Sequence, residues 1–144
     1  MSLNVAVIGA GTVGGGVIQA LTANGDMLRA RAGRDIRLTH VCELNEKNLQ
    51  GLALEGVTVT KDAKSLFANP DIDVICELIG GENPAKAFIL DALRAKKHVV
   101  TANKMLLAKH GPELARTAIE NGVDLRYEAA VAGTIPIIKS LREG

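Results

Sequence analysis

Hydrophobic residues along the chain occur in short runs that alternate with longer stretches of helical periodicity. Runs such as VAVI and DVICELI are continuous rather than alternating, which is typical of parallel strands buried on both faces. We therefore predict strands over residues 3–9, 35–44, 56–60, 72–80, 98–102 and 123–131.

The stretches between these runs have the pattern of amphipathic helices. In the first of them, residues 13–33, the side chains of Val13, Val17, Leu21 and Leu28 lie near one helical face. Further helices are expected over residues 62–71, 83–97, 111–122 and 134–144. Their ends carry common signals, which are Asp62 and Thr134 as N-caps, Pro84 and Pro112 near the first turn, and Gly122 after the last turn.

The regular alternation of strands and helices predicts an α/β fold of the Rossmann type. We expect a doubly wound parallel sheet with strand order 3-2-1-4-5-6, formed as one domain over residues 1–144. The last predicted helix is barely two turns long where the sequence stops. We therefore expect that a substrate domain follows in a longer protein.

Composition narrows the class of protein. Hydrophobic residues make up 47% of the chain and aromatic residues only 2%, so the core is expected to consist of Val, Ile, Leu and Ala. The 17 basic and 16 acidic residues give a net charge of +1 without a basic stripe, which argues against nucleic-acid and membrane-surface partners.

Other sequence features favour a cytoplasmic protein. No apolar run approaches the about 20 residues of a transmembrane helix, and the N-terminus lacks the features of a signal peptide. Cys42 and Cys76 lie far apart within apolar runs, so we predict buried free thiols.

A glycine-rich motif follows the first predicted strand. Gly9, Gly11 and Gly14 form G-x-G-x-x-G between a strand and a helix. Glycines at this spacing permit a tight turn, a close backbone approach to a pyrophosphate and close helix–strand packing. Free N–H groups and the positive end of the helix dipole then bind phosphate. The alternative is a glycine-rich turn with a purely structural role.

Glu43, at the end of the second predicted strand, is the candidate for binding the adenosine ribose. It lies 29 residues after Gly14, compared with the usual spacing of about 20. Its charge would repel a 2′-phosphate and favour NAD over NADP, although Lys47 lies close enough to weaken that preference. The alternative is a solvated glutamate at a strand end.

Two further candidates follow later strands. Gly80 and Gly81 end the fourth strand, where a glycine pair allows backbone contact with a cofactor or forms an ordinary strand–helix turn. The segment TANK ends the fifth strand and places Asn103 and Lys104 at the same rim, toward the nicotinamide. A lysine there can contact substrate oxygen or move protons. The alternative is a solvent-exposed lysine at a helix start, a position that the helix dipole disfavours.

The three histidines do not join this rim. We interpret His40 and His98 as structural residues of strands and His110 as a surface residue at a helix end.

The order of three segments resembles one known family. VAVIGAGTVGGGV, the stretch from ELIGG to VTANK, and EAAVAGTIPII are similar to the nucleotide-binding domain of homoserine dehydrogenase, over residues 5–143. The resemblance implies the interconversion of L-homoserine and L-aspartate 4-semialdehyde by hydride transfer with NAD(P), in the biosynthesis of threonine, methionine and isoleucine.

The resemblance also implies roles for individual residues. Lys104 matches a catalytic lysine near the nicotinamide. A monovalent cation, usually sodium, is implied at Glu128, Val131, Gly133 and Ile135, where an irregular turn offers oxygen ligands. Together with the motifs above, the predicted cofactor-binding residues are Gly9, Gly11, Thr12, Val13, Gly14, Glu43, Ile79, Gly80, Gly81, Thr101, Asn103 and Lys104.

Two departures from the family pattern matter. Cys42 stands where many relatives carry an arginine able to meet a 2′-phosphate, which strengthens the preference for NAD, with NADP as the alternative. The family's homoserine-binding carboxylates, second catalytic lysine and most of its homodimer interface would lie after Gly144. We therefore expect this chain to bind cofactor without turnover. The other hypotheses are a different NAD-dependent dehydrogenase and a non-enzymatic dinucleotide-sensing module.

Overall fold

A parallel sheet forms the centre of the protein. The structure, a computed structural model, describes residues 2–133 and 135–143. Within these residues six strands pair in parallel in the order β3-β2-β1-β4-β5-β6, which confirms the predicted doubly wound sheet. The strands are β1 Leu3–Ile8, β2 Ile36–Cys42, β3 Thr58–Thr60, β4 Val74–Glu77, β5 His98–Thr101 and β6 Leu125–Arg126.

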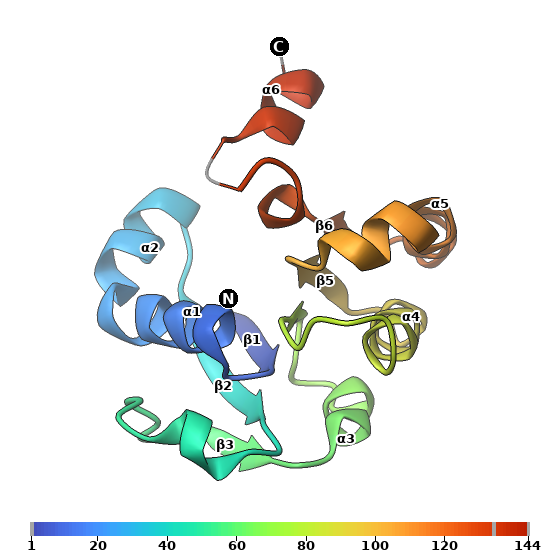
Figure 1. Cartoon of the computed structure of the whole chain (residues 1–144). Coiled ribbons are helices and arrows are strands. Elements are labelled where there is room, and N and C mark those ends of the chain that lie inside the picture. Colours follow the sequence, from blue (N-terminus) through green and yellow to red (C-terminus); the bar gives the residue numbers. More distant parts are fainter. Residues whose placement is uncertain (1, 134, 144) are drawn as a thin grey trace.

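Helices cover the two faces of the sheet. They are α1 Thr12–Ala23, α2 Gly25–Ala32, α3 Ala63–Ala68, α4 Ala85–Arg94, α5 Lys104–Asn121 and α6 Ile137–Glu143, with short 3-10 helices η1 Glu46–Leu49 and η2 Glu128–Ala130. Figure 1 shows α1 and α2 on one side of the sheet and α3, α4 and α5 on the other. It also shows α6 projecting from the body of the domain, next to η2.

The apolar strands are buried on both sides, as their continuous hydrophobic runs predict. Along β1, Ala6 and Ile8 face the cluster that includes α3, α4 and α5, whereas Val5 and Val7 face the cluster that includes α1. Because successive side chains of a strand point to opposite faces, only an uninterrupted apolar run can fill both clusters.

Several predicted element ends are confirmed. Asp62 caps α3 by accepting a hydrogen bond from the backbone N–H of Lys64, at 2.9 Å. Gly122 ends α5 with a left-handed φ of 66°. Pro84 stands one position before the first turn of α4, as its N-cap. The predicted cap at Thr134 lies outside the described residues.

Two helices in the structure differ in extent from their predictions. The segment 13–33 forms two helices, because α1 ends at Ala23 and Leu28 belongs to α2. The helix predicted over 111–122 begins earlier, at Lys104, because Asn103 caps it. Pro112 therefore lies inside α5, where it has no N–H to donate to the preceding turn.

The last predicted strand is much shorter than expected. β6 ends at Arg126, and η2 replaces the rest of the predicted segment. The following turn contains left-handed residues at Ala132 and Gly133, which an extended strand cannot accommodate.

The strand order fixes where a ligand site is expected. The helix that follows β1 and the helix that follows β4 cover opposite faces of the sheet. A crevice therefore opens between the carboxyl ends of these two neighbouring strands. The residues predicted to bind a dinucleotide lie at or directly after the carboxyl ends of β1, β2, β4 and β5.

Candidate functional site

The glycine-rich loop connects β1 to α1 in a conformation that requires glycine. Gly9 has a φ of +93°, and a Cβ placed on Gly14 would lie 1.8 Å from the Gly9 carbonyl oxygen. Gly11 is the N-cap of α1, and no acidic side chain occupies the first turn of this helix. Backbone N–H groups at the start of α1 are therefore available for an anion. Thr12 and Val13, the other predicted contacts, form the exposed first turn.

Glu43 lies directly beside this loop. Its Oε2 accepts a hydrogen bond from the backbone N–H of Ala10 at 2.6 Å, and its Oε1 accepts one from Asn45 at 2.8 Å. Partial burial acts to raise the pKa of Glu43, but the hydrogen bonds from Asn45 and Ala10 outweigh it, so the pKa is lowered. Glu43 is therefore an anionic acceptor at the edge of the glycine-rich loop.

An apolar hollow of about 360 Å³ extends from Glu43 toward β4. It is lined by residues that include Leu44, Ile79, Gly80 and Phe88. Leu44 and Ile79 are large apolar side chains that stay exposed, at 73% and 38%. A flat apolar group such as an adenine ring fits a site of this kind.

A lysine that the sequence analysis missed also lines this hollow. Lys61 follows β3, and its ammonium is 2.7 Å from Glu46. Lys47, the lysine weighed from the sequence, belongs instead to η1. The predicted pairing of the second and third strands could have indicated Lys61, because it places the residue after β3 next to Glu43, the residue after β2.

The ends of β4 and β5 are joined by buried polar contacts. Gly80 and Gly81 have φ values of 69° and 73°, so this turn favours glycine at both positions. Asn103 is only 7% exposed, and its side-chain amide donates to the Gly81 carbonyl oxygen at 2.6 Å. Its Oδ1 accepts from the Leu106 N–H at 3.1 Å. Asn103 thus caps α5 and holds the glycine turn.

Thr101 lies beneath this rim. Its side chain is fully buried and its hydroxyl hydrogen-bonds to Glu77 at 2.7 Å. Sequence reasoning missed Glu77, because the residue stands within an apolar run and looks like an ordinary strand position.

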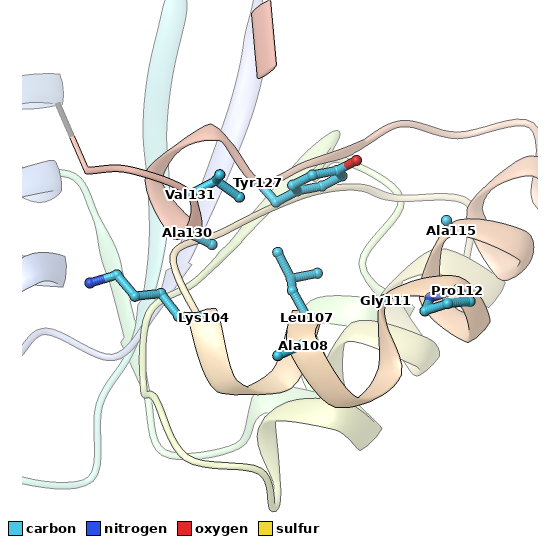
Figure 2. Close-up of a pocket in the computed structure, with 9 residues that line it drawn as sticks. All are labelled: Lys104, Leu107, Ala108, Gly111, Pro112, Ala115, Tyr127, Ala130 and Val131. Carbon is cyan, nitrogen blue, oxygen red and sulfur yellow. The ribbon is translucent and has the colours of Figure 1, made fainter. Parts of the chain in front are cut away.

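Lys104 is the first residue of α5 and is exposed. Figure 2 shows its ammonium extending past the start of the helix, away from the side chains of Leu107 and Tyr127. Lys104 also borders an open groove of about 540 Å³ between α5 and the η2 segment, whose other lining residues include Ala108, Pro112 and Val131. Lys104 lines this groove, whereas the hollow beside Glu43 is lined by other residues.

The residues predicted to bind a cation follow β6. Both carboxylate oxygens of Glu128 accept hydrogen bonds at the start of α6, from the N–H groups of Ile138 and Lys139 at 2.9 Å each. Val131, Gly133 and Ile135 belong to the irregular turn between η2 and α6. In residues 2–133 and 135–143, no three His, Cys, Asp or Glu side chains gather in a way that suits a metal. A site built from backbone carbonyls stays a prediction.

The predictions for the three histidines have mixed outcomes. His98 accepts a hydrogen bond from the Asp124 N–H and His40 contacts Asn69, as structural residues would. The prediction for His110 is wrong: it lies in the middle of α5 and contacts Glu82 at 2.8 Å, because α5 begins earlier than expected.

Cys42 and Cys76 are buried free thiols, as predicted. Burial raises the pKa of Cys76 to about 11, and it also raises the pKa of Cys42, so neither thiol is an activated nucleophile. No helix in the described part of the chain has the length and apolar character needed to cross a membrane.

Comparisons with known proteins agree with this geometry. The family model for the NAD-binding domain of homoserine dehydrogenase matches residues 9–128. Homoserine dehydrogenase from Neisseria gonorrhoeae is 44% identical over 99% of this chain and 32% of its own length, and that from Bacillus subtilis is 40% identical over 99% and 33%.

Solved structures give the same result. The crystal structure of a homoserine dehydrogenase from Thiobacillus denitrificans is 43% identical, with a TM-score of 0.92 over 100% of this chain and 33% of that one. The Staphylococcus aureus homoserine dehydrogenase at pH 8.5 has a TM-score of 0.82 at 36% identity, over 90% of this chain and 33% of that one. This chain thus spans about a third of the length of these relatives. The chain belongs to the homoserine dehydrogenase family, of which it represents the NAD-binding domain.

Proposed function

We propose that this chain binds NAD(H) in the crevice between the glycine-rich loop and the ends of β2, β4 and β5. The observation that carries the proposal is the Glu43 carboxylate 2.6 Å from the backbone N–H of Ala10. This contact joins an acceptor for ribose hydroxyls to a loop that binds pyrophosphate. The close approach of Gly14 to Gly9 supports the fit, because any side chain at position 14 would push the N-terminus of α1 away from the loop.

Each half of the dinucleotide has its own surface in this proposal. The N-terminus of α1 holds the pyrophosphate, with Gly9, Gly11, Thr12, Val13 and Gly14 around it. The hollow of about 360 Å³ accepts the adenosine, with Ile79 as its apolar wall. The nicotinamide ribose lies toward Gly80, Gly81, Asn103 and Lys104, and Thr101, the remaining predicted contact, lies buried beneath them.

NAD is the preferred form of the cofactor in this proposal. Glu43 would repel a 2′-phosphate, and Cys42 supplies no positive charge. Lys61, the cation in the hollow, is already paired with Glu46. NADP is the weaker alternative.

In a full-length protein we assign to this domain the cofactor half of a homoserine dehydrogenase reaction. L-homoserine and L-aspartate 4-semialdehyde are interconverted, and the nicotinamide, when bound, accepts or supplies the hydride. Lys104 supplies positive charge and a hydrogen-bond donor where the substrate oxygen gains or loses a proton. Its position at the rim, with its ammonium beyond the start of α5, supports this role.

Other parts of the proposal concern the full-length protein. A homodimer, a cytoplasmic location and a monovalent cation at Glu128, Val131, Gly133 and Ile135 accompany the assigned activity. The turn after η2, with left-handed Ala132 and Gly133, supports the cation site because its backbone is irregular and carbonyl oxygens are ligands that hard cations accept.

The test uses the 144-residue chain itself. NADH and NADPH are titrated separately, and binding is followed by the change in nicotinamide fluorescence. We expect saturable binding with a lower Kd for NADH, and no homoserine-dependent reduction of NAD. A lower Kd for NADPH would contradict the cofactor preference, and turnover by the purified chain would contradict the assignment of the remaining machinery to another domain.

A further inference from the structure

A buried carboxylate lies directly under the proposed crevice. Glu77 is the last residue of β4, and its side chain is 0% exposed. Glutamates are almost never fully buried unless they are paired. The partners of Glu77 are neutral donors: the backbone N–H of Ile79 reaches Oε1 at 3.0 Å, and the hydroxyl of Thr101 reaches Oε2 at 2.7 Å.

These bonds begin a chain that ends in the first turn of α5. The Thr101 hydroxyl donates its one hydrogen to Glu77 and accepts from the Asn103 N–H at 3.1 Å. The Asn103 amide then donates to the Gly81 carbonyl oxygen and accepts from the Leu106 N–H. The Glu77 carboxylate therefore holds the backbone directly after β4 and, through Thr101 and Asn103, the start of α5.

Glu77 also lies near the start of α1, the helix that follows the glycine-rich loop. A small cavity of about 100 Å³ lies between the first turn of α1 and the ends of β4 and β5. Its lining residues are Val13, Glu77, Leu78, Gly80, Ala102 and Asn103. A shift of Glu77 would change the width of the crevice at the point where the two strands part.

We infer that Glu77 is a positioning residue for the dinucleotide site, which holds the Ile79–Gly81 backbone and, through Thr101 and Asn103, the start of α5 that carries Lys104. The inference rests on the proposed function and deepens it. Glu77 touches no ligand in this scheme, and it acts only through the groups that line the crevice.

The carboxylate is suited to this task because both of its oxygens accept. Glutamine has the same shape, but only one end of its amide can accept a hydrogen bond. In Glu77→Gln the amide nitrogen would face either the Ile79 N–H or the Thr101 hydroxyl. One buried donor would then lose its acceptor, or Thr101 would have to turn away.

The test measures NADH affinity of the 144-residue chain in four variants, with the melting temperature of each recorded in the same buffer. Glu77→Gln and Thr101→Val remove the central bonds without changing the side-chain shape. We expect each to raise the Kd for NADH about tenfold or more. Thr101→Ser keeps the hydroxyl and should recover most of the affinity lost in Thr101→Val.

Thr117→Val is the matched control. Thr117 is a buried threonine of α5, but its hydroxyl bonds to the Glu113 carbonyl oxygen within the helix, at 3.0 Å. The same change of chemistry there should shift the Kd by less than about twofold. All titrations are made well below the melting temperature of each variant, so that the Kd reports on folded protein. If Glu77→Gln does not fold, the pair Thr101→Val and Thr101→Ser decides the question.

The outcomes separate this inference from the proposed function. One outcome is that the unmodified chain binds NADH while Glu77→Gln and Thr101→Val bind it as tightly and show only lower melting temperatures. In that case Glu77 has only a structural role, and the proposed function stands while the inference fails. A Thr101→Ser variant as weak as Thr101→Val also overturns it. If the unmodified chain binds no NADH, the proposed function fails and the inference fails with it.

Discussion

Glu43 and Glu77 both stand at the carboxyl ends of parallel strands, yet the two halves of the rim use their glutamates in different ways. In the half formed after β1 and β2, Glu43 is partly exposed and accepts hydrogen bonds from loop N–H groups. In the half formed after β4 and β5, Glu77 is fully buried and accepts from an inner hydroxyl.

The difference separates groups that are available to a ligand from groups that hold the protein in shape. The β1–β2 half presents its acceptor and the start of α1 at the surface. The β4–β5 half uses its polar groups in internal hydrogen bonds and leaves the Lys104 ammonium exposed. We therefore expect substitutions in the first half to change which ligand binds, and substitutions in the second half to change how well the site is formed.

The largest effect is expected at Gly14, in the β1–β2 half. A Cβ at this position would lie 1.8 Å from a backbone oxygen, so Gly14→Ala forces the loop and α1 apart. We expect a loss of about 1–3 kcal/mol or more in unfolding free energy, and weaker NADH binding if the variant folds. Urea titration and NADH titration measure the two quantities.

A matched control lies two residues further along the same helix. A Cβ on Gly16 has no neighbour within 4 Å. Gly16→Ala should therefore stabilise α1, by up to about 1 kcal/mol. Equal behaviour of the two variants would show that helix propensity, and not the close approach of Gly14 to Gly9, governs this loop.

The next effect concerns Lys104, the exposed group of the β4–β5 half. In a full-length homoserine dehydrogenase that carries this domain, Lys104→Ala should lower kcat by at least about 100-fold. The melting temperature should hardly change, because the side chain is exposed at a helix start where a cation is unfavourable. Lys104→Arg should also be impaired, because guanidinium does not exchange protons near neutral pH.

Lys64→Ala is the control for this experiment. Lys64 is also an exposed lysine in the first turn of a helix, α3. Steady-state kinetics should show a normal kcat for this variant. Near-normal turnover of Lys104→Ala would mean that Lys104 is an ordinary surface lysine.

A smaller effect is expected at Glu43, which tests whether the β1–β2 half selects the ligand. Glu43→Gln removes the charge that repels a 2′-phosphate, and we expect the preference for NADH over NADPH to narrow about fivefold. The measurement is the ratio of the two Kd values. Glu55→Gln changes an exposed carboxylate before the amino end of β3, whereas Glu43 follows the carboxyl end of β2, and it should leave the ratio unchanged.

The sequence was sufficient to predict features that depend on nearby residues. The glycine-rich loop and the Asp62 and Gly122 caps each follow from a pattern within a few positions, and the strand order follows from the alternation of strands and helices. The resemblance of whole motifs supplied the family. Both kinds of inference work because hydrophobic periodicity and backbone sterics are local constraints.

The features that were missed depend on residues that are distant in the sequence. Glu77 meets Thr101 only because β4 and β5 pair in the register that aligns these two positions. The early start of α5 depends on Asn103 as its N-cap, whereas the sequence had indicated for this residue only a position facing the nicotinamide. His110 finds Glu82 across 28 positions, so neither partner indicates the other in the sequence.

The smallest effect concerns the loop after Gly81, which belongs to the β4–β5 half. Glu82 forms hydrogen bonds with Lys109 at 2.6 Å and with His110 at 2.8 Å. These hydrogen bonds lower the pKa of Glu82 from about 4.5 to about 2, and the one with Lys109 has the larger effect. A carboxyl whose pKa is lower in the folded state contributes stability above its ordinary pKa and loses it as the pH falls through the folded value.

Glu82→Gln tests whether this contact holds the loop. The melting temperature of the unmodified chain should exceed that of the variant above pH 4.5, and the gap should close as the pH falls toward 2, because protonation then removes the same charge. Glu43 and Glu113 also have lowered pKa values, so both proteins should still lose stability in acid, and only the difference between them is diagnostic. A gap that stays constant across this range would mean that the charge of Glu82 does not stabilise the loop. The β4–β5 half would then depend on the uncharged hydrogen bonds of Asn103 for its attachment to α5.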